Sequence, residues 1–192
     1  MLHQRTREAM FLVEEGARPE QIDKLLYDFG FPMGPFAMAD MAGLDVGYKV
    51  REERRKAGKV EKRDSRWIDQ IVEMGRHGQK TGAGIYRYQD GRSPLPDPEI
   101  QELIARCARE AGVTQRAIGD QEILERCLYP MVNEGAKILE EGIAARALDI
   151  DIIWINGYGF PAYRGGPMFW ADHIGLKNIV AAYRRYAEQF GA

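Results

Sequence analysis

The chain has 192 residues, of which 45% are hydrophobic and 29% are charged, and its net charge is −2. This length suits one globular domain or two small ones. A net charge so close to zero argues against binding to nucleic acid through a basic surface. No apolar run approaches the roughly 20 residues that a membrane-spanning helix needs. We therefore expect neither nucleic acid nor a membrane as a partner.

The cysteines and the start of the chain bear on its compartment. Cys107 and Cys127 both fall within helical patterns, which suits buried thiols in a reducing compartment. The first residues lack the apolar core and the cleavage site of a signal peptide. These features predict a cytoplasmic protein. His3, His77 and His173 are scattered without the spacing of metal ligands, so no metal site is expected.

Helices are predicted in the first part of the chain over residues 2–15, 19–29, 35–40 and 44–56. Pro19 and Pro35 each occupy a first helical position, where the missing N–H costs nothing. The helix over residues 44–56 is expected to turn Val46 and Val50 inward and a basic face outward.

The composition of the sequence changes in the middle of the chain. Asp64 and Ser65 are expected to cap a helix whose apolar residues begin at Trp67. Residues 78–88, GQKTGAGIYRY, are rich in glycine and then alternate, which predicts a loop that enters a short extended segment. The proline-rich stretch at residues 93–98 reads as a linker.

Further helices are predicted over residues 99–110, about 120–141, 148–155 and about 176–190. The segment 148–155 is apolar enough to be buried. Because almost nothing in the chain reads as sheet, the predicted fold class is all-α.

One stretch of the sequence occurs twice. Residues 30–44 read GFPMGPFAMADMAGL, and the later copy has GFP at residues 159–161 and GPMFWADHIGL at residues 166–176. A Glu-Glu-Gly triplet precedes each copy, and the corresponding positions lie 126 to 132 residues apart. This order predicts two tandem repeats, residues 1–94 and 95–192.

The repeated turns have two readings. In one reading both are structural turns only. In the other, the first copy also lines a ligand pocket. Asp40 and Asp172 follow the turns in corresponding places. We expect both to accept hydrogen bonds from backbone donors near the following Gly-Leu, and not to act as acid or base.

Several motifs in order carry a family resemblance. They are EEGARPEQID at residues 14–23, the stretch 30–44, GQKTGAGIY at 78–86, NEG at 133–135, GFP at 159–161 and RGGPM at 164–168. Together they resemble the C-terminal helical part of NAD-dependent 3-hydroxyacyl-CoA dehydrogenases, over essentially the whole chain. Two copies in one chain resemble the tail of the multifunctional β-oxidation enzymes, which join an enoyl-CoA hydratase to this dehydrogenase.

The resemblance has consequences for the fold and the assembly. It implies two helical bundles of the 6-phosphogluconate-dehydrogenase C-terminal-like type, related by a pseudo-two-fold axis. Single-copy members of the family dimerise through this domain, and the tandem chain looks like that contact made within one molecule. The partners implied are an acyl-CoA substrate and the Rossmann and hydratase portions of the intact enzyme, and assembly with a second copy of the chain is left open.

The family's catalytic machinery is not expected here. Its NAD-binding Rossmann domain carries a G-x-G-x-x-G turn, whereas the segment 82–84, GAG, lacks the third glycine and follows no apolar strand. The family's catalytic His and Glu lie in that domain. Its catalytic Asn, in an Asn-Arg pair, would fall just before Met1, and the second copy has Glu125-Arg126 instead. We therefore expect a fragment without catalytic residues or bound cofactor, inactive alone, with NAD held by another domain of the intact enzyme.

The candidate substrate-binding residues are those of the first turn together with one lysine: Pro32, Met33, Gly34, Pro35, Phe36 and Lys80. The resemblance suggests that the turn faces the acyl chain and that Lys80 meets a CoA phosphate or amide. An exposed turn explains Lys80 equally well. A basic stretch between Lys49 and Arg63 is read as a solvated face, with recognition of the CoA nucleotide as the less favoured alternative.

Three functions stay open at this point. The first is the substrate and assembly domain of a 3-hydroxyacyl-CoA dehydrogenase. The second is a free-standing helical acyl-CoA-binding or subunit-interaction module. The third and least favoured is an independent enzyme that uses its own carboxylates. An in-frame Rossmann sequence upstream of Met1 would favour the first.

Overall fold

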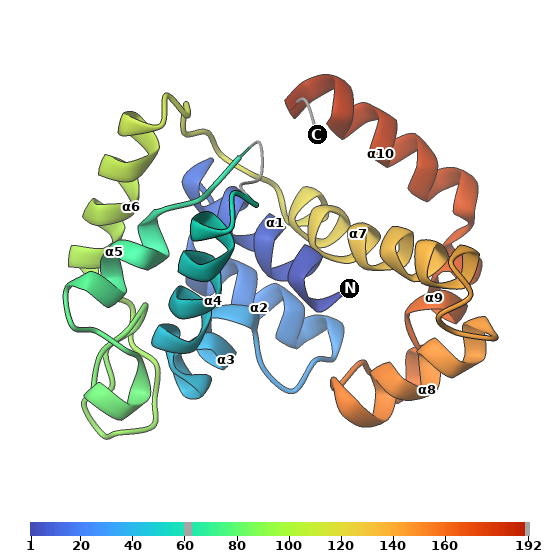
Figure 1. Ribbon diagram of the computed structural model, residues 1–192, viewed down its shortest axis with the longest axis horizontal. Helices are drawn as coiled ribbons and strands as arrows, with labels where there is room; N and C mark the ends of the chain where they lie inside the picture. The colour runs from blue at the N-terminus through green and yellow to red at the C-terminus, as the bar shows by residue number, and fades with distance from the viewer. Residues whose placement is uncertain (60–62, 191–192) are drawn as a thin grey trace. The chain divides into compact units, whose positions relative to one another are not determined.

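The computed structural model describes residues 1–59 and 63–190, and these are helical almost throughout (Figure 1). The α-helices are α1 (Leu2–Glu14), α2 (Pro19–Phe29), α3 (Pro35–Ala42), α4 (Leu44–Lys56), α5 (Trp67–Glu73), α6 (Pro98–Glu110), α7 (Asp120–Glu140), α8 (Ala147–Gly157), α9 (Pro167–Ile174) and α10 (Leu176–Phe190), and the 3-10 turns are η1 (Gln79–Thr81) and η2 (Ala162–Arg164).

The all-α prediction is confirmed. In the described ranges, pairing between extended segments is limited to isolated bridges among residues 78–95, where a short extended segment was predicted. No helix in this part of the chain is both long and apolar enough to cross a membrane.

Proline sets where several helices begin. Pro19 and Pro35 start α2 and α3 as predicted, and Pro98 and Pro167 start α6 and α9 in the same way. The predicted cap of α5 is wrong. That helix follows Arg66, and the Ser65 hydroxyl bonds to a glutamate instead.

The chain folds into two compact units that share α1 and α2. Unit 1 contains Met1–Ala9, Tyr27–Pro32 and the described residues from Gly119 onward. Unit 2 contains Met10–Leu26 and the described residues of Met33–Ile118. This division groups residues by contact and differs from a cut after residue 94. The proposed pair of sequence repeats remains a prediction.

The core of unit 1 is aromatic. Phe29 lies 5.3 Å from Trp170 and 5.8 Å from Phe160, between ring centroids, and Phe31 lies 5.5 Å from Phe160. The guanidinium of Arg5, which is 1% exposed, covers the Phe31 ring at 4.6 Å. Edge-to-face rings and a cation over a ring add attraction to the burial of apolar area.

The two Gly-Phe-Pro segments pack against each other in unit 1. A Cβ on Gly30 would lie 2.7 Å from Pro161, and a Cβ on Gly159 would lie 2.8 Å from Pro32. Both glycines also have positive φ angles, so both positions require glycine. Such a reciprocal contact is what a two-fold axis between the segments would produce, and it supports the predicted pseudo-symmetry without establishing it.

Helix α8 departs from its prediction. Ile150, Asp151 and Trp154 are buried against the rest of unit 1, but Leu148 and Ile153 are 53% and 55% exposed. The prediction that this apolar segment is buried therefore holds for one face of the helix and is wrong for the other. The helix packs against α7 and α9, and its remaining face is uncovered.

In unit 2, ion pairs join α4 to α5, and the valines that were predicted to face inward do not. Val46 and Val50 are 58% and 53% exposed, so that prediction is wrong. Arg51 and Arg55 each place a guanidinium nitrogen 2.6 Å from Asp69, whose side chain is 1% exposed. A buried carboxylate needs such partners, and here they fix which face of α4 turns inward.

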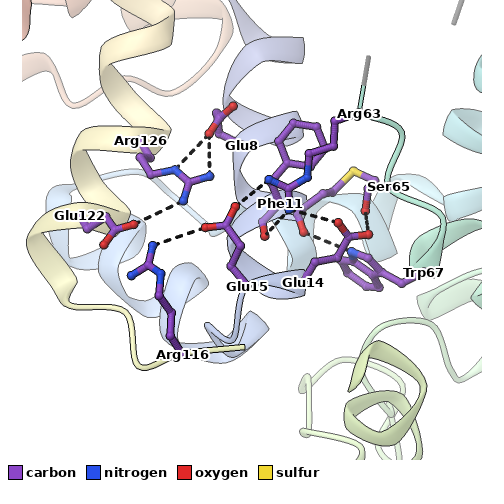
Figure 2. Close-up of polar contacts among 11 residues, drawn as sticks. Glu8, Phe11, Glu14, Glu15, Arg63, Ser65, Trp67, Arg116, Glu122 and Arg126 are labelled. Carbon is purple, nitrogen blue, oxygen red and sulfur yellow. Dashed lines mark hydrogen bonds and ion pairs between the residues drawn. The ribbon is translucent and has the colours of Figure 1, made fainter. Parts of the chain in front are cut away.

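The end of α1 carries two buried carboxylates in unit 2 (Figure 2). Glu14 accepts a hydrogen bond from the Ser65 hydroxyl at 2.7 Å, and Glu15 accepts one from Arg63 at 2.7 Å. Arg63 also reaches Glu14 at 3.3 Å, and the Arg116 backbone N–H donates to the Glu15 carbonyl at 2.8 Å. Burial raises the pKa of Glu14, so its charge depends on these donors.

Replacing Arg63 by alanine is expected to lower the free energy of unfolding by about 3 kcal/mol, because it leaves two buried carboxylates short of a partner. Urea unfolding at pH 7 measures this. Arg66→Ala is the matched control, since Arg66 is 55% exposed and its nearest carboxylate oxygen is 3.7 Å away. The control should cost less than about 0.5 kcal/mol. Equal losses for both variants would contradict the role given to Arg63.

Candidate functional site

The structure divides the candidate residues between the units. Pro32 belongs to unit 1, where it is exposed and touches Gly159. Met33, Gly34, Pro35, Phe36 and Lys80 belong to unit 2. Five of the six candidate residues therefore lie in one unit.

The turn before α3 is held by an aspartate from the preceding helix. Gly34 stands at the N-cap of α3 and has no side chain to accept from the free N–H groups of the first turn. Asp23 of α2 accepts from the Phe36 N–H at 2.9 Å and from the Ala37 N–H at 2.8 Å. The approach requires glycine, because a Cβ on Gly34 would lie 2.3 Å from the Asp23 Cα.

Burial limits which turn side chains a ligand can reach. Phe36 is 1% exposed, and its ring lies 5.8 Å from that of Trp67 in the core of unit 2. Gly34 and Pro35 are also buried, whereas Met33 is partly exposed. Phe36 and its buried neighbours therefore hold the turn, and Met33 is the turn side chain of unit 2 that solvent reaches.

A second aspartate binds the glycine-rich segment. Asp40 of α3 is 0% exposed and accepts from the Ile85 and Tyr86 N–H groups, each at 2.9 Å, and from the Tyr88 hydroxyl at 3.0 Å. The prediction that Asp40 bonds backbone donors is confirmed, although the donors lie in residues 78–88 and not beside Gly43. Gly84 allows the approach, since a Cβ there would lie 2.1 Å from Asp40.

Tyr86 connects the two aspartates. Its backbone N–H donates to Asp40, and its hydroxyl donates to Asp23 at 2.9 Å. The turn of residues 33–36 and the segment 78–88 are thus tied into one hydrogen-bonded network, which we call the Asp23–Asp40 network: Asp23, Asp40, Tyr86 and Tyr88. Sequence analysis gave no role to Asp23, Tyr86 or Tyr88.

A matching arrangement occurs in unit 1. Asp151 of α8 accepts from the Met168 N–H at 2.7 Å and from the Phe169 N–H at 3.2 Å, at the start of α9. Asp172, which was predicted to accept from backbone donors near Gly175 and Leu176, is exposed, and the buried acceptor in this unit is Asp151 instead. The signal available in the sequence was an aspartate in the helix before each Gly-Pro, at Asp23 and Asp151.

Burial dominates the electrostatics of the network. It raises the pKa of Asp23 to about 6, against the opposing effect of the donors from Phe36, Ala37 and Tyr86, and the nearby Asp40 adds to the rise. Burial also raises the pKa of Asp40. The pKa of Tyr86 rises through burial and the adjacent carboxylates, so its hydroxyl remains a donor.

Lys80 lies in η1 and is engaged. Its ammonium is 2.5 Å from an Asp45 oxygen at the start of α4, and its side chain is 49% exposed. The hydrogen bond from Lys80 lowers the pKa of Asp45. A phosphate or an amide carbonyl at Lys80 would share the ammonium with Asp45.

The basic stretch is largely neutralised within the chain. Arg51 and Arg55 bind Asp69, and Arg63 binds Glu14 and Glu15. Lys62 lies outside the described residues. These ion pairs occupy Arg51, Arg55 and Arg63, so these three side chains form neither the predicted solvated face nor a free site for the CoA nucleotide. No group of three His, Cys, Asp or Glu side chains that could hold a metal occurs in residues 1–59 and 63–190.

The Asp23 pKa makes stability depend on pH. Since the folded value of about 6 exceeds the ordinary 3.8, the folded state binds the proton more tightly. The stabilising contribution is therefore present below about pH 4 and is lost as the pH rises through 6. Relative to Asp23→Asn, the wild-type chain should lose about 1 kcal/mol of unfolding free energy between pH 5 and pH 7.

Urea unfolding of both proteins across this range measures the difference. The exposed Asp172→Asn is the control, and its difference from wild type should stay flat. A wild-type advantage over Asp23→Asn that grows with pH would show that the sign is wrong.

Comparisons with known proteins agree on one family. The model of the 3-hydroxyacyl-CoA dehydrogenase C-terminal domain matches residues 1–88 and 123–192. The peroxisomal bifunctional enzyme of Homo sapiens is 42% identical over 202 residues, covering 98% of this chain and 28% of the human protein. The peroxisomal bifunctional enzyme of Danio rerio is 45% identical over 199 residues, covering 97% of this chain and 28% of the fish protein.

A solved structure is also similar. The dehydrogenase part of multifunctional enzyme 1 from C. elegans has a TM-score of 0.67 and 35% identity, covering 83% of this chain and 35% of that one. The chain spans a little over a quarter of the length of the curated relatives above.

The relatives correct one prediction. The cytoplasmic location is contradicted, because the similar enzymes are named as peroxisomal. The inference from the cysteines concerned only a reducing compartment and could not separate the cytoplasm from an organelle. The family itself is shown by the match over most of the sequence. The chain belongs to the 3-hydroxyacyl-CoA dehydrogenase family, of which it carries the C-terminal domain.

Proposed function

We propose that this chain forms the substrate-facing and assembly part of an enzyme that oxidises 3-hydroxyacyl-CoA to 3-ketoacyl-CoA with NAD. The support is the match to the family's C-terminal domain and the similarity to bifunctional enzymes of peroxisomes. In this proposal NAD is bound by a separate domain of the intact enzyme, and a hydratase portion accompanies it. The 192-residue chain alone would then bind substrate weakly and would not catalyse its oxidation.

The observation that carries the proposal is the Asp23–Asp40 network. It joins the turn that bears Met33 to the segment that bears Lys80, within unit 2. Met33 offers a partly exposed apolar side chain and Lys80 a partly exposed cation. One apolar and one cationic group on a rigid support suit a ligand with an acyl chain and a polar, phosphate-bearing head.

The second copy of the turn is less suited to a ligand. In place of Met33 it has residues 162–165, of which Ala162–Arg164 form η2. The Tyr163 hydroxyl and the Arg164 Nε both donate to the Phe29 carbonyl, at 2.8 Å and 2.9 Å. These bonds satisfy a carbonyl at the end of α2, so this insertion is engaged in packing against that helix. We therefore assign any ligand contact to the first turn.

Acetoacetyl-CoA added to the isotopically labelled chain should shift the NMR signals of Met33 and its neighbours Gly34 and Phe36, together with that of Lys80. The affinity should be weak, with a Kd in the range of about 0.1–1 mM, because a half-enclosed ligand buries little surface. A reverse assay on the same sample, with acetoacetyl-CoA and NADH, should show no NADH oxidation above the uncatalysed rate.

Lys80→Met supplies the matched variant, since it keeps the length of the side chain and removes its charge. It should weaken binding about threefold to tenfold. Shifts confined to residues 159–167 would show that the second turn is the ligand site. Clear NADH oxidation would show that the chain holds its own dinucleotide site and catalytic base.

A further inference from the structure

The Asp23–Asp40 network contains more donors and acceptors than capping one helix requires. Asp23 accepts three hydrogen bonds, from Phe36, Ala37 and Tyr86. Asp40 accepts three more, from Ile85, Tyr86 and Tyr88. A simple N-cap needs one acceptor for one or two backbone N–H groups. The surplus bonds run from helices α2 and α3 to residues 85–88, which follow the loop that carries Lys80.

Close approaches of glycine backbone to the two aspartates in unit 2 support the same link between the turn and the Lys80 loop. Gly34 lies against Asp23, and Gly78 and Gly84 lie against Asp40, each so closely that a Cβ would overlap. Gly78 stands directly before η1, in which Lys80 lies. The backbone on both sides of Lys80 is thus packed against one aspartate, and the backbone after Met33 is packed against the other.

We propose that Asp23 is a positioning residue for substrate, which holds the Met33 turn and, through Tyr86, the Lys80 loop in the arrangement that binds acyl-CoA. The proposal rests on the function proposed above and adds a residue that does not itself touch the ligand. Its action depends on the carboxylate form of Asp23, because a carboxylate accepts on both oxygens. A protonated carboxyl turns one of these oxygens into a donor, and each oxygen faces a backbone N–H, of Phe36 or of Ala37, that would then lose its acceptor.

The surroundings of Asp23 determine where this change occurs. The charged or titratable groups that face the network are Asp40 from α3, Tyr86 and Tyr88 from the segment after η1, Glu20 from α2, which acts on Tyr86, and Arg76, which acts on Asp40. Burial and Asp40 favour the neutral form of Asp23, and the three donors favour the charged form. The change therefore falls near pH 6.

The test combines ligand affinity with a readout that needs no ligand. Calorimetry with acetoacetyl-CoA on the 192-residue chain should show affinity about fivefold weaker at pH 5 than at pH 7.5, the effect of losing about one hydrogen bond in the support. The ligand's own phosphate also titrates near pH 6, so the affinity of every variant changes with pH to some extent. The informative quantity is therefore the difference in pH dependence between wild type and the variants. Asp23→Asn should bind weakly and lose the excess pH dependence, whereas Asp151→Asn in unit 1 should keep the wild-type profile.

NMR of the ligand-free chain gives the second readout. The Phe36 and Ala37 amide signals should titrate together near pH 6 in wild type and in Asp151→Asn, and not in Asp23→Asn. If Asp23→Asn does not fold, the test is the comparison of the wild-type chain with Asp151→Asn. The proposal then requires that affinity and these two amides change with the same midpoint.

The failures of the two proposals differ. No binding of acetoacetyl-CoA at any pH would overturn the acyl-CoA site, and the positioning role with it, even if the amides titrate. Binding by wild type and Asp23→Asn with the same affinity and the same pH profile would overturn the positioning role and leave the site in place. Amides that do not titrate between pH 5 and pH 7.5 would also overturn it.

Discussion

The Gly-Pro turn leaves the first N–H groups of α3 without an acceptor of their own, and the structure of unit 2 depends on how they are satisfied. Glycine at the N-cap offers no side chain, and proline at the next position offers no donor. The aspartate of α2 therefore accepts from the following two residues, and it must be desolvated to do so. This one contact fixes α2 against α3, and it requires the glycine.

The same constraint is met in unit 1 by Asp151 at the start of α9. The two helices also end alike, since Gly43 and Gly175 have φ angles of 97° and 92° and the same ψ of 118°. What differs is the addition of Tyr86 and the segment 78–88 to the first copy. There the aspartate is part of a larger network, and in the second copy it caps a helix. This difference supports giving a ligand-related role to the first copy.

Much of the fold could be predicted because it is encoded locally. Proline and glycine mark the helix ends, and the bounds of α2, α4 and α10 match their predictions. The errors concern long-range partners. Val46 and Val50 fit a helical period, but the arginines on the other face of α4 meet a buried aspartate, which no local pattern shows. The outward face of α8 was missed for the same reason.

The sequence identified the candidate turn and Lys80, but not the side chains that hold them together. The turn and Lys80 were named from the family motif, and the structure connects them. Periodicity could not show that Phe36 points into the core, that Pro32 belongs to the other unit, or that Asp23 lies beneath the turn. The position of Asp23 alone depends on hydrogen bonds between residues 13 to 63 positions apart.

Asp23 and Tyr86 act together to join the turn to the Lys80 loop. A double-mutant cycle of Asp23→Asn and Tyr86→Phe, followed by urea unfolding at pH 7, measures this directly. The claim predicts a coupling free energy of about 1 kcal/mol or more, because the two side chains share a buried hydrogen bond. The control cycle of Asp151→Asn with Tyr86→Phe should be additive. Additivity within about 0.3 kcal/mol for Asp23 and Tyr86 as well would contradict the claim.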